Sequence, residues 1–367
     1  MGHVPAGGLV TILTGLAVGL MFGFVLQRGR FCMNTAFRDV IFIQDMTLFR
    51  AYLLALIIAI LGSNLMEDFG ILISVNPETG AVITEELRRQ SFLPVANIVG
   101  GYLFGLGIVL AGGCGSGILY KIGEGAFAAL VAVLGFFIGI AATLHGWLSP
   151  IYGWITRFEV EIAGKNNPAL WELFGSSPMA KWITIAAVCS AALIVVARGK
   201  PFAKATKGYY WSTTGLLVGI VVVIAWWVSS YFGSGPRGIS FTNPTKEFFF
   251  SLLTGSSDAN DPEFNFFGIF KSTWSALSVI GVPIGAYLSA HGLKEFKLKA
   301  PSANELLTVF LGSLLMGFGS AVSGGCNVGH GLTGASTLAI SSIVTTVSIL
   351  MGNWTMVYFK FIKPMQD

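Results

Sequence analysis

The sequence predicts an all-α integral membrane protein with about nine transmembrane helices and further short re-entrant helices. Hydrophobic residues make up 54% of the chain and charged residues only 11%, whereas globular domains are about a quarter charged. Apolar runs of roughly 18 residues or more recur along the whole length, as expected of membrane-spanning helices. A glycine-rich motif near Gly100 also returns 212 residues later at Gly312. No stretch is long and polar enough to form a separate water-soluble domain.

Nine apolar segments are long enough to span a bilayer. They cover approximately 8–26, 48–66, 95–111, 126–146, 179–197, 212–232, 265–290, 305–322 and 336–359. The first segment has no basic residues before it and no small-residue cleavage site after it, so we interpret it as a retained helix and not as a signal peptide.

The loops between these segments differ in positive charge, which sets orientation in a membrane. With the 27–47 loop placed in the cytoplasm, fourteen of the 22 Lys and Arg residues fall on the cytoplasmic side and eight fall elsewhere. An eight- or ten-helix count would put the basic clusters at 28–38 and 198–207 on opposite sides. We therefore expect nine helices, an N-terminus outside and a cytoplasmic C-terminus.

The chain contains an internal repeat. A gapless shift of 212 residues gives eight identities within eighteen positions, and a shift of 209 residues gives a shorter match. The first match pairs Gly100, Leu103, Gly105, Gly107, Gly112, Gly113, Cys114 and Gly117 with Gly312, Leu315, Gly317, Gly319, Gly324, Gly325, Cys326 and Gly329, and the second pairs Arg28, Gly29 and Asn34 with Arg237, Gly238 and Asn243.

The repeat and the helix count together predict an inverted-topology repeat. Residues 1–165 form the first half with helices one to four, 166–205 hold a connecting fifth helix, and 206–367 form the second half. Because one helix separates the halves, the second half enters the membrane in the opposite sense. The substrate path of such folds usually lies between the halves, near the membrane midplane.

Three of the four cysteines occupy parallel positions, each just after a predicted spanning helix in a segment broken by glycine or polar residues. Irregular backbone at membrane depth is tolerated only where protein or a water-filled cavity satisfies it, so we expect these re-entrant segments to line a pathway. Cys189 lies within a span and is expected to be an apolar filler. The candidate pathway residues are Cys32, Cys114, Cys326, Gly113, Gly115, Gly325, Asn34 and Asn327.

The predicted topology brings Cys32 and Cys114 in from the cytoplasmic side and Cys326 from the opposite side, which predicts an hourglass with thiols at its waist. The fourth equivalent place, near Ser240, has no cysteine, so the pathway should be asymmetric. A thiol is a weak donor and a polarisable group, which suits a soft sulfur anion better than a hard anion. Backbone N–H groups at helix N-termini add attraction for negative charge.

Several other functions find no support in the motifs. No pair of cysteines shows CxxC or another metal-ligand spacing, although soft metals favour thiolate and the wide spacing of the three cysteines neither supports nor excludes a metal site. No phosphate-binding loop of the GxxxxGK[ST] type is present. We expect no catalytic residues, no cofactor and no nucleic-acid partner. The alternatives to a transporter of a sulfur anion are a carrier that holds a covalent persulfide on a cysteine, and a transporter of another solute such as a selenium species or a soft metal.

The three cysteine motifs GRFCMNTAFRD, AGGCGSG and SGGCNVGHGLTG resemble those of the YeeE/YedE family of bacterial membrane proteins, which includes thiosulfate uptake transporters. The resemblance covers nearly the whole chain. It implies an hourglass-shaped inverted repeat in the inner membrane and thiosulfate import for cysteine biosynthesis. It also implies that Cys32, Cys114 and Cys326 contact the ion in turn through S–H hydrogen bonds. A small cytoplasmic sulfurtransferase-like partner is a further implication, and we expect it to be a separate protein because the chain ends at Asp367.

Overall fold

The computed structural model describes residues 9–75, 82–199, 208–233, 235–254, 264–266 and 270–366. These residues form thirteen α-helices: α1 (Leu9–Gly29), α2 (Met33–Phe42), α3 (Thr47–Asp68), α4 (Pro94–Leu110), α5 (Gly115–Gly123), α6 (Phe127–Leu144), α7 (Ser149–Thr156), α8 (Pro178–Ala197), α9 (Trp211–Phe232), α10 (Asn243–Thr254), α11 (Trp274–Gly292), α12 (Ala303–Ser323) and α13 (Ile340–Val357). Shorter elements are the 3-10 turns Leu170–Leu173 and Lys363–Met365, the π-helices Gly329–Gly334 and Tyr358–Ile362, and the strands β1 (Ile73–Val75), β2 (Val82–Thr84), β3 (Phe264–Phe266) and β4 (Phe270–Ser272).

Eight helical segments among the described residues are long and apolar enough to cross a membrane, by length and composition. Each overlaps one of the nine predicted spans. The predicted span 265–290 has no counterpart among the eight, and its first part is wrong: β3 and β4 form an antiparallel hairpin there, and α11 begins only at Trp274. Serines, Pro283 and His291 within α11 lower its mean hydropathy.

Four short helical segments follow sharp reversals of the chain. Arg30, Gly112, Gly238 and Gly324 have φ values of 50°, 73°, 61° and 83°, in the left-handed region. Each of these residues lies between a long helix and a short one, namely α2, α5, α10 and the helical segment 327–336 that contains the Gly329–Gly334 π-helix. Glycine adopts this conformation without strain, which explains three of the four reversals.

Glycines let the long helices approach closely. A Cβ atom at Gly23 of α1 would lie 2.0 Å from the carbonyl oxygen of Val282 in α11. In the same way, a Cβ at Gly107 of α4 would lie 2.6 Å from the Met316 backbone nitrogen in α12. Small residues at helix interfaces are how membrane helices associate when lipid offers no hydrophobic driving force between them.

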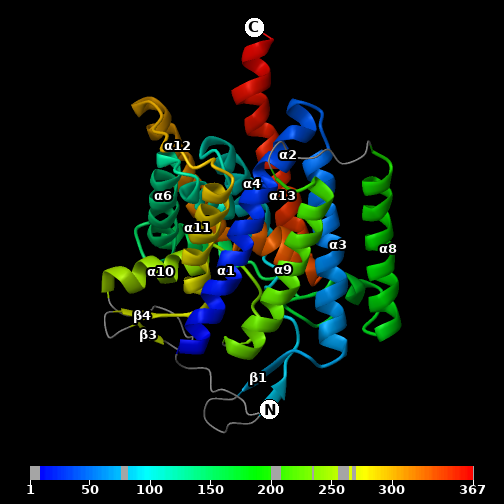
Figure 1. Cartoon of the computed structure of the whole chain (residues 1–367). Coiled ribbons are helices and arrows are strands. Elements are labelled where there is room, and N and C mark those ends of the chain that lie inside the picture. Colours follow the sequence, from blue (N-terminus) through cyan, green and yellow to red (C-terminus); the bar gives the residue numbers. More distant parts are fainter. Residues whose placement is uncertain are drawn as a thin grey trace.

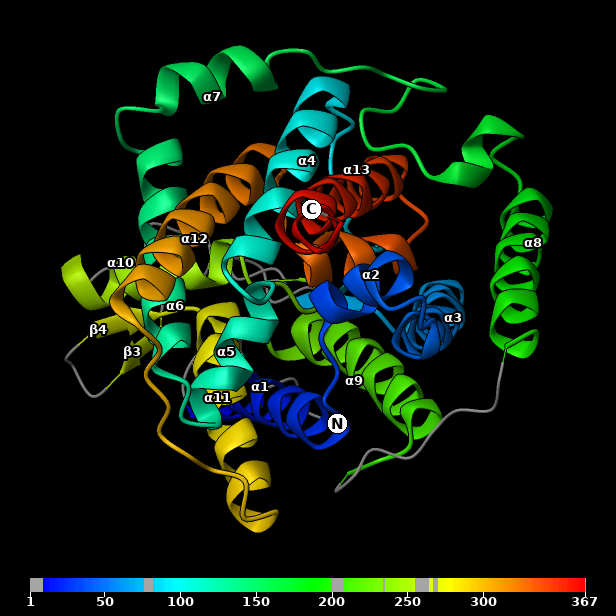
Figure 2. The same cartoon turned by 90° about the horizontal axis from the view of Figure 1, so that it is seen from above.

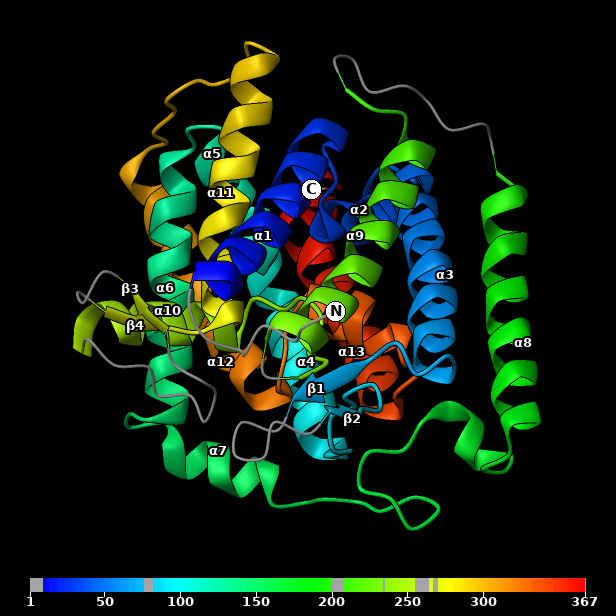
Figure 3. The same ribbon diagram turned by 60° about the horizontal axis from the view of Figure 1, so that its bottom comes forward.

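The main helix contacts join segments far apart in the sequence. Helix α1 packs along α11 and α3 packs along α9, while α4 packs against α12 and α13, and α6 packs against α12 (Figure 2). Each of these contacts joins a helix before residue 166 to one after residue 205. The hairpins β1–β2 and β3–β4 lie at the end where α1 begins, and α2 lies at the opposite end, where α13 points (Figures 1 and 3).

Helix α8 stands at the edge of the bundle beside α3 (Figure 2). Lys181 of α8 donates to Glu67 Oε2 at 2.7 Å and to Asp68 Oδ1 at 2.6 Å, both at the end of α3. The Trp182 indole also donates to Asp68, at 2.7 Å. These bonds fix the peripheral helix to the bundle at one end.

Candidate functional site

Each of the three predicted cysteines lies at the start of a short helix. Cys32 and Cys114 are the N-cap residues of α2 and α5 and have extended backbones. Cys326 immediately precedes the helical segment 327–336. All three side chains are buried, at 4%, 0% and 0% exposure. Orphan backbone N–H groups at such helix starts are weak anion ligands.

The three thiols gather around the first turn of α5. A Cβ atom at Gly117 would lie 3.0 Å from Cys32 Sγ and 3.4 Å from Cys114 Sγ, and a Cβ at Gly115 would lie 3.8 Å from Cys326 Sγ. Cys114 Sγ also lies 3.5 Å from Ser116 Oγ, within hydrogen-bond distance. The topology therefore brings together the three cysteines and Gly115 of the predicted set.

The two predicted asparagines have different surroundings. Asn34 Oδ1 accepts a hydrogen bond from Asn353 Nδ2 at 2.8 Å, so its side chain has a structural partner. Asn327 is 1% exposed, and within the described part of the chain neither polar atom of its side chain has a hydrogen-bond partner. A buried amide without partners is costly, so Asn327, next to Cys326, is the better candidate for contact with a ligand.

The remaining predicted residues shape the backbone around the cysteines. Gly325 precedes Cys326, and a Cβ there would lie 2.8 Å from the His330 ring. His330 Nε2 donates to the Ser323 carbonyl oxygen at 2.9 Å, which leaves Nδ1 to accept from Ser342 Oγ at 3.2 Å. Gly113 precedes Cys114, and a Cβ there would come within 3.3 Å of the Gly117 backbone. Both glycines keep their loops close to the helices that follow them.

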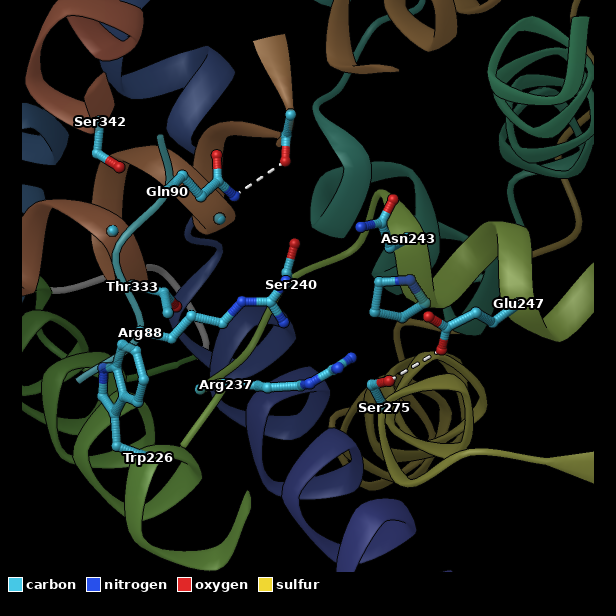
Figure 4. A pocket seen from close by; sticks show the side chains of 15 residues that line it. Arg88, Gln90, Trp226, Arg237, Ser240, Asn243, Glu247, Ser275, Thr333 and Ser342 are labelled. Atoms are coloured by element: carbon cyan, nitrogen blue, oxygen red, sulfur yellow. Dashed lines mark hydrogen bonds between the residues drawn. The ribbon is translucent and has the colours of Figure 1, made fainter. Parts of the chain in front are cut away.

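A pocket of about 80 Å³ is lined by Gly324 and Gly329, which lie on either side of Cys326 in the sequence. Its polar lining includes Arg88, Gln90, Arg237, Ser240, Asn243 and Glu247. Figure 4 shows both arginine side chains reaching into the space between Trp226 on one side and Asn243 on the other. Two guanidinium groups and several neutral donors can hold an anion, because bidentate donors suit oxyanions.

The pocket adjoins the thiols through Gly329, which is one of its lining residues. A Cβ at Gly329 would lie 2.8 Å from Ser240 Oγ and 3.9 Å from Cys326 Sγ. The sequence alone did not indicate Arg88 or Arg237 as site residues. The only signal was the match of Arg237 with Arg28 in the repeat, since residues of separate loops meet only after folding.

Polar side chains cluster at the other side of the thiols, near the start of α2 and the end of α5. Gln27 Nε2 lies 3.3 Å from both Glu124 Oε1 and Glu295 Oε2. Arg30 forms a 2.7 Å ion pair with Glu295. Lys121 Nζ donates to the Gly112 carbonyl oxygen. This polar cluster ties α1, α5 and the loop after α11 together.

Cys189 lies on the peripheral helix α8 and is partly exposed, so the structure separates it from the other three cysteines. Among the described residues, no group of three or more His, Cys, Asp or Glu side chains is arranged to hold a metal ion.

Comparison with known proteins finds matches over almost the whole chain. A family model described as "Sulphur transport" matches residues 28–355. The thiosulfate transporter TsuA of Spirochaeta thermophila is 33% identical over 359 residues, covering 95% of this chain and 99% of the relative. TsuA of Escherichia coli K12 is 29% identical over 362 residues, covering 96% of both chains. The probable transporter YedE of the same strain is 30% identical over 135 residues, 36% of this chain and 30% of the relative.

Proposed function

Because this chain belongs to the sulphur transport family, we propose that it imports thiosulfate into the cytoplasm past Cys32, Cys114 and Cys326. The relatives that match over the full length are named as thiosulfate transporters, not as enzymes, and the family resemblance of the sequence motifs is confirmed. The observation that carries the proposed route is the gathering of three buried thiols around Gly115 and Gly117.

The chemistry of the thiols supports a soft anion as cargo. Neutral S–H groups donate weak hydrogen bonds, and the polarisable sulfur atom of a thiol suits contact with the sulfur end of thiosulfate. Because the binding groups are weak donors, the ion can leave a site as readily as it enters, which conduction requires. Asn327 adds an amide whose atoms have no other partner in the described residues.

The arginine pocket supports an entry site next to Cys326. The proposed route of the ion runs from the pocket past Ser240 and Gly329 to Cys326. It continues past Gly115 to Cys114, and past Gly117 to Cys32. Positive charge at a mouth raises the local concentration of an anion and its rate of entry. The cluster of Gln27, Glu124 and Glu295 then marks the exit.

The helix pairing supports the inverted repeat. Exchanging α1 with α9, α3 with α11, α4 with α12 and α6 with α13 maps the contact of α1 with α11 onto that of α9 with α3. The same exchange maps the contact of α4 with α13 onto that of α12 with α6. We propose halves at 1–165 and 206–367 joined by α8, with α11 as the ninth span and an hourglass between the halves.

The distribution of basic residues supports an N-terminus outside and a C-terminus in the cytoplasm of a bacterial inner-membrane protein. In this orientation the Arg88 loop and the pocket face outward. A small sulfurtransferase-like protein that receives the ion on the cytoplasmic side stays a prediction from the family resemblance.

Uptake of labelled thiosulfate by cells lacking other routes tests the transport proposal. Cys114→Ala and Cys326→Ala should each reduce uptake strongly, because each removes a donor along the route. Cys189→Ala on α8 is the matched control and should retain uptake. If Cys114→Ala and Cys326→Ala both transport as well as this control, the thiol pathway is wrong.

A covalent sulfur carrier is the second candidate. The feature that favours it is Lys121 on α5, the helix whose first turn lies against Cys32 Sγ, since a nearby cation stabilises a thiolate. In that mechanism a thiolate attacks the outer sulfur of thiosulfate, the S–S bond of the ion breaks, and sulfite leaves with the electron pair. Intact-mass measurement after exposure to thiosulfate separates the two: a gain of one sulfur atom indicates the carrier, and an unchanged mass indicates passage.

A further inference from the structure

The repeat places a phenylalanine where the fourth thiol would be. The 209-residue shift that aligns Arg28 with Arg237 and Asn34 with Asn243 also aligns Cys32 with Phe241. Phe241 lies two residues before the start of α10, and Cys32 lies one residue before the start of α2. Three of the four equivalent places therefore hold a thiol, and the fourth holds an aromatic ring.

The Phe241 side chain lies within the thiol cluster. It is fully buried, at 0% exposure. A Cβ atom at Gly115 would lie 3.3 Å from Phe241 Cβ and 3.8 Å from Cys326 Sγ, so Phe241 and Cys326 approach the same point of α5. The ring stacks on Phe22 of α1, with centroids 5.7 Å apart and an angle of 23° between the planes.

The same residue adjoins the arginine pocket. Ser240 and Asn243, on either side of Phe241 in the sequence, both line that pocket (Figure 4). The backbone on which the ring is mounted is held at two points: Thr333 Oγ1 donates to the Ile239 carbonyl oxygen at 2.6 Å, and Thr245 Oγ1 donates to the Phe241 carbonyl oxygen, also at 2.6 Å. These two bonds hold the backbone that carries the ring.

We propose that the Phe241 ring is an apolar gate between the arginine pocket and the thiols, and that it sets specificity by excluding strongly hydrated anions. The proposal rests on the transport function proposed above. An apolar constriction excludes water and closes a pathway by dewetting. A strongly hydrated ion must give up its hydrogen bonds to water to cross such a constriction, which is costly. The sulfur end of thiosulfate is weakly hydrated and can pass.

Thiol labelling tests the gate without measuring transport. The probe is a charged, membrane-impermeant methanethiosulfonate reagent added to the purified protein, and peptide mass spectrometry gives the labelling rate at each cysteine. Phe241→Ala should raise the labelling rates of Cys114 and Cys326 by roughly tenfold, because the reagent then reaches them from the pocket. Phe241→Leu should stay near the wild-type rate, since it keeps an apolar side chain in place.

Phe136→Ala is the matched control, because Phe136 is also fully buried but lies on α6, outside the thiol cluster. The labelling rates in Phe136→Ala show how far the removal of any buried ring loosens the whole fold and exposes the cysteines. Equal labelling of Phe241→Ala and wild-type protein would overturn the gate. So would a rise in Phe136→Ala as large as that in Phe241→Ala.

Sulfate uptake tests the specificity part of the proposal. Phe241→Ala should raise the uptake of labelled sulfate relative to thiosulfate, and an unchanged ratio would overturn the role in specificity. The labelling result stands apart from the cargo: if wild-type protein moved no thiosulfate but Phe241→Ala exposed the thiols, the function would fail and the gate would stand. If wild-type protein took up thiosulfate normally but Phe241→Ala did not change the labelling, the transport function would stand and the gate would be wrong.

Discussion

The sulfur atoms of Cys32 and Cys114 face the same glycine, so the first turn of α5 is the meeting point of two segments 82 residues apart (114 − 32). A Cβ atom at Gly117 would lie 3.0 Å from one sulfur and 3.4 Å from the other. Non-bonded heavy atoms prefer about 3.5–4 Å, and a methyl group there would push the two thiols apart. The absence of a side chain at residue 117 therefore leaves room for both sulfur atoms against α5.

We expect Gly117→Ala to reduce thiosulfate uptake by about tenfold while the protein remains in the membrane in normal amounts. The added methyl separates the Cys32 and Cys114 sulfurs, and each transfer of the ion between them becomes less favourable. Labelled uptake normalised to protein amount measures the effect. Gly153→Ala on α7 is the control, since no heavy atom lies within 4 Å of a Cβ at that residue; equal uptake by the two variants would contradict the prediction.

The arginine pocket should act on capture of the ion. We expect Arg88→Gln and Arg237→Gln each to raise the KM for thiosulfate several-fold with a small effect on maximal uptake, because each removes attraction at the entrance. Added salt should weaken wild-type uptake more than that of the double variant. Arg157→Gln, at an exposed arginine after α7, should behave as wild type. A KM for the double variant equal to that of this control would exclude the pocket from capture.

The polar cluster of Gln27, Glu124 and Glu295 predicts that the stability of the folded protein depends on pH. Burial raises the pKa of the Glu124 carboxyl above its usual value of 4.5, although the Gln27 hydrogen bond and the Arg30 charge oppose the rise. Between pH 4.5 and the folded-state pKa, the Glu124 carboxyl is therefore protonated in the folded protein and ionised in the unfolded chain. The resulting stability is fully present below pH 4.5 and is lost as the pH rises through the folded-state pKa.

We expect Glu124→Gln to lack this part of the pH dependence, and to unfold at a higher temperature than wild type above the folded-state pKa of Glu124. Thermal unfolding in detergent at a series of pH values measures it. Glu161→Gln, at an exposed position, serves as the control. Parallel curves for wild type and Glu124→Gln would show that the carboxyl does not titrate in this way.

The attachment of α8 should depend on Lys181. Lys181→Met leaves the carboxylates of Glu67 and Asp68 without this cation, and breaking a buried pair costs about 3–5 kcal/mol. Asp68 is 37% exposed, so solvent reduces that cost. We expect the unfolding temperature to fall by a few degrees, about 2–4 °C for each kcal/mol lost, with uptake per molecule retained.

Glu86→Ala is the control for the ion pairs of Lys181, because Glu86 is 84% exposed and lies 4.0 Å from its partner Arg89. It should leave the unfolding temperature unchanged. A Lys181→Met protein as stable as the Glu86→Ala protein would show that other contacts hold α8.

Hydropathy alone located most of the long helices, because the bilayer demands about 20 apolar residues from each. It misplaced the start of α11, where the β3–β4 hairpin occupies residues within the predicted span. Apolar composition does not distinguish Phe-rich strand from helix over so short a run. The short helices after Cys32 and Cys114 were foreseen because glycine and polar residues interrupt the apolar pattern there.

The sequence by itself determined the membrane class and the family, and it singled out the three cysteines as candidates, because these depend on composition and on short motifs that can be read without coordinates. Only the tertiary structure decided that Gly115 and Gly117 are the surfaces on which the thiols meet, that Arg88 and Arg237 share a pocket, and that Phe241 lies among the cysteines. The physical reason is that these residues come from different helix ends, and only the packing of glycine-faced helices fixes the distances between them.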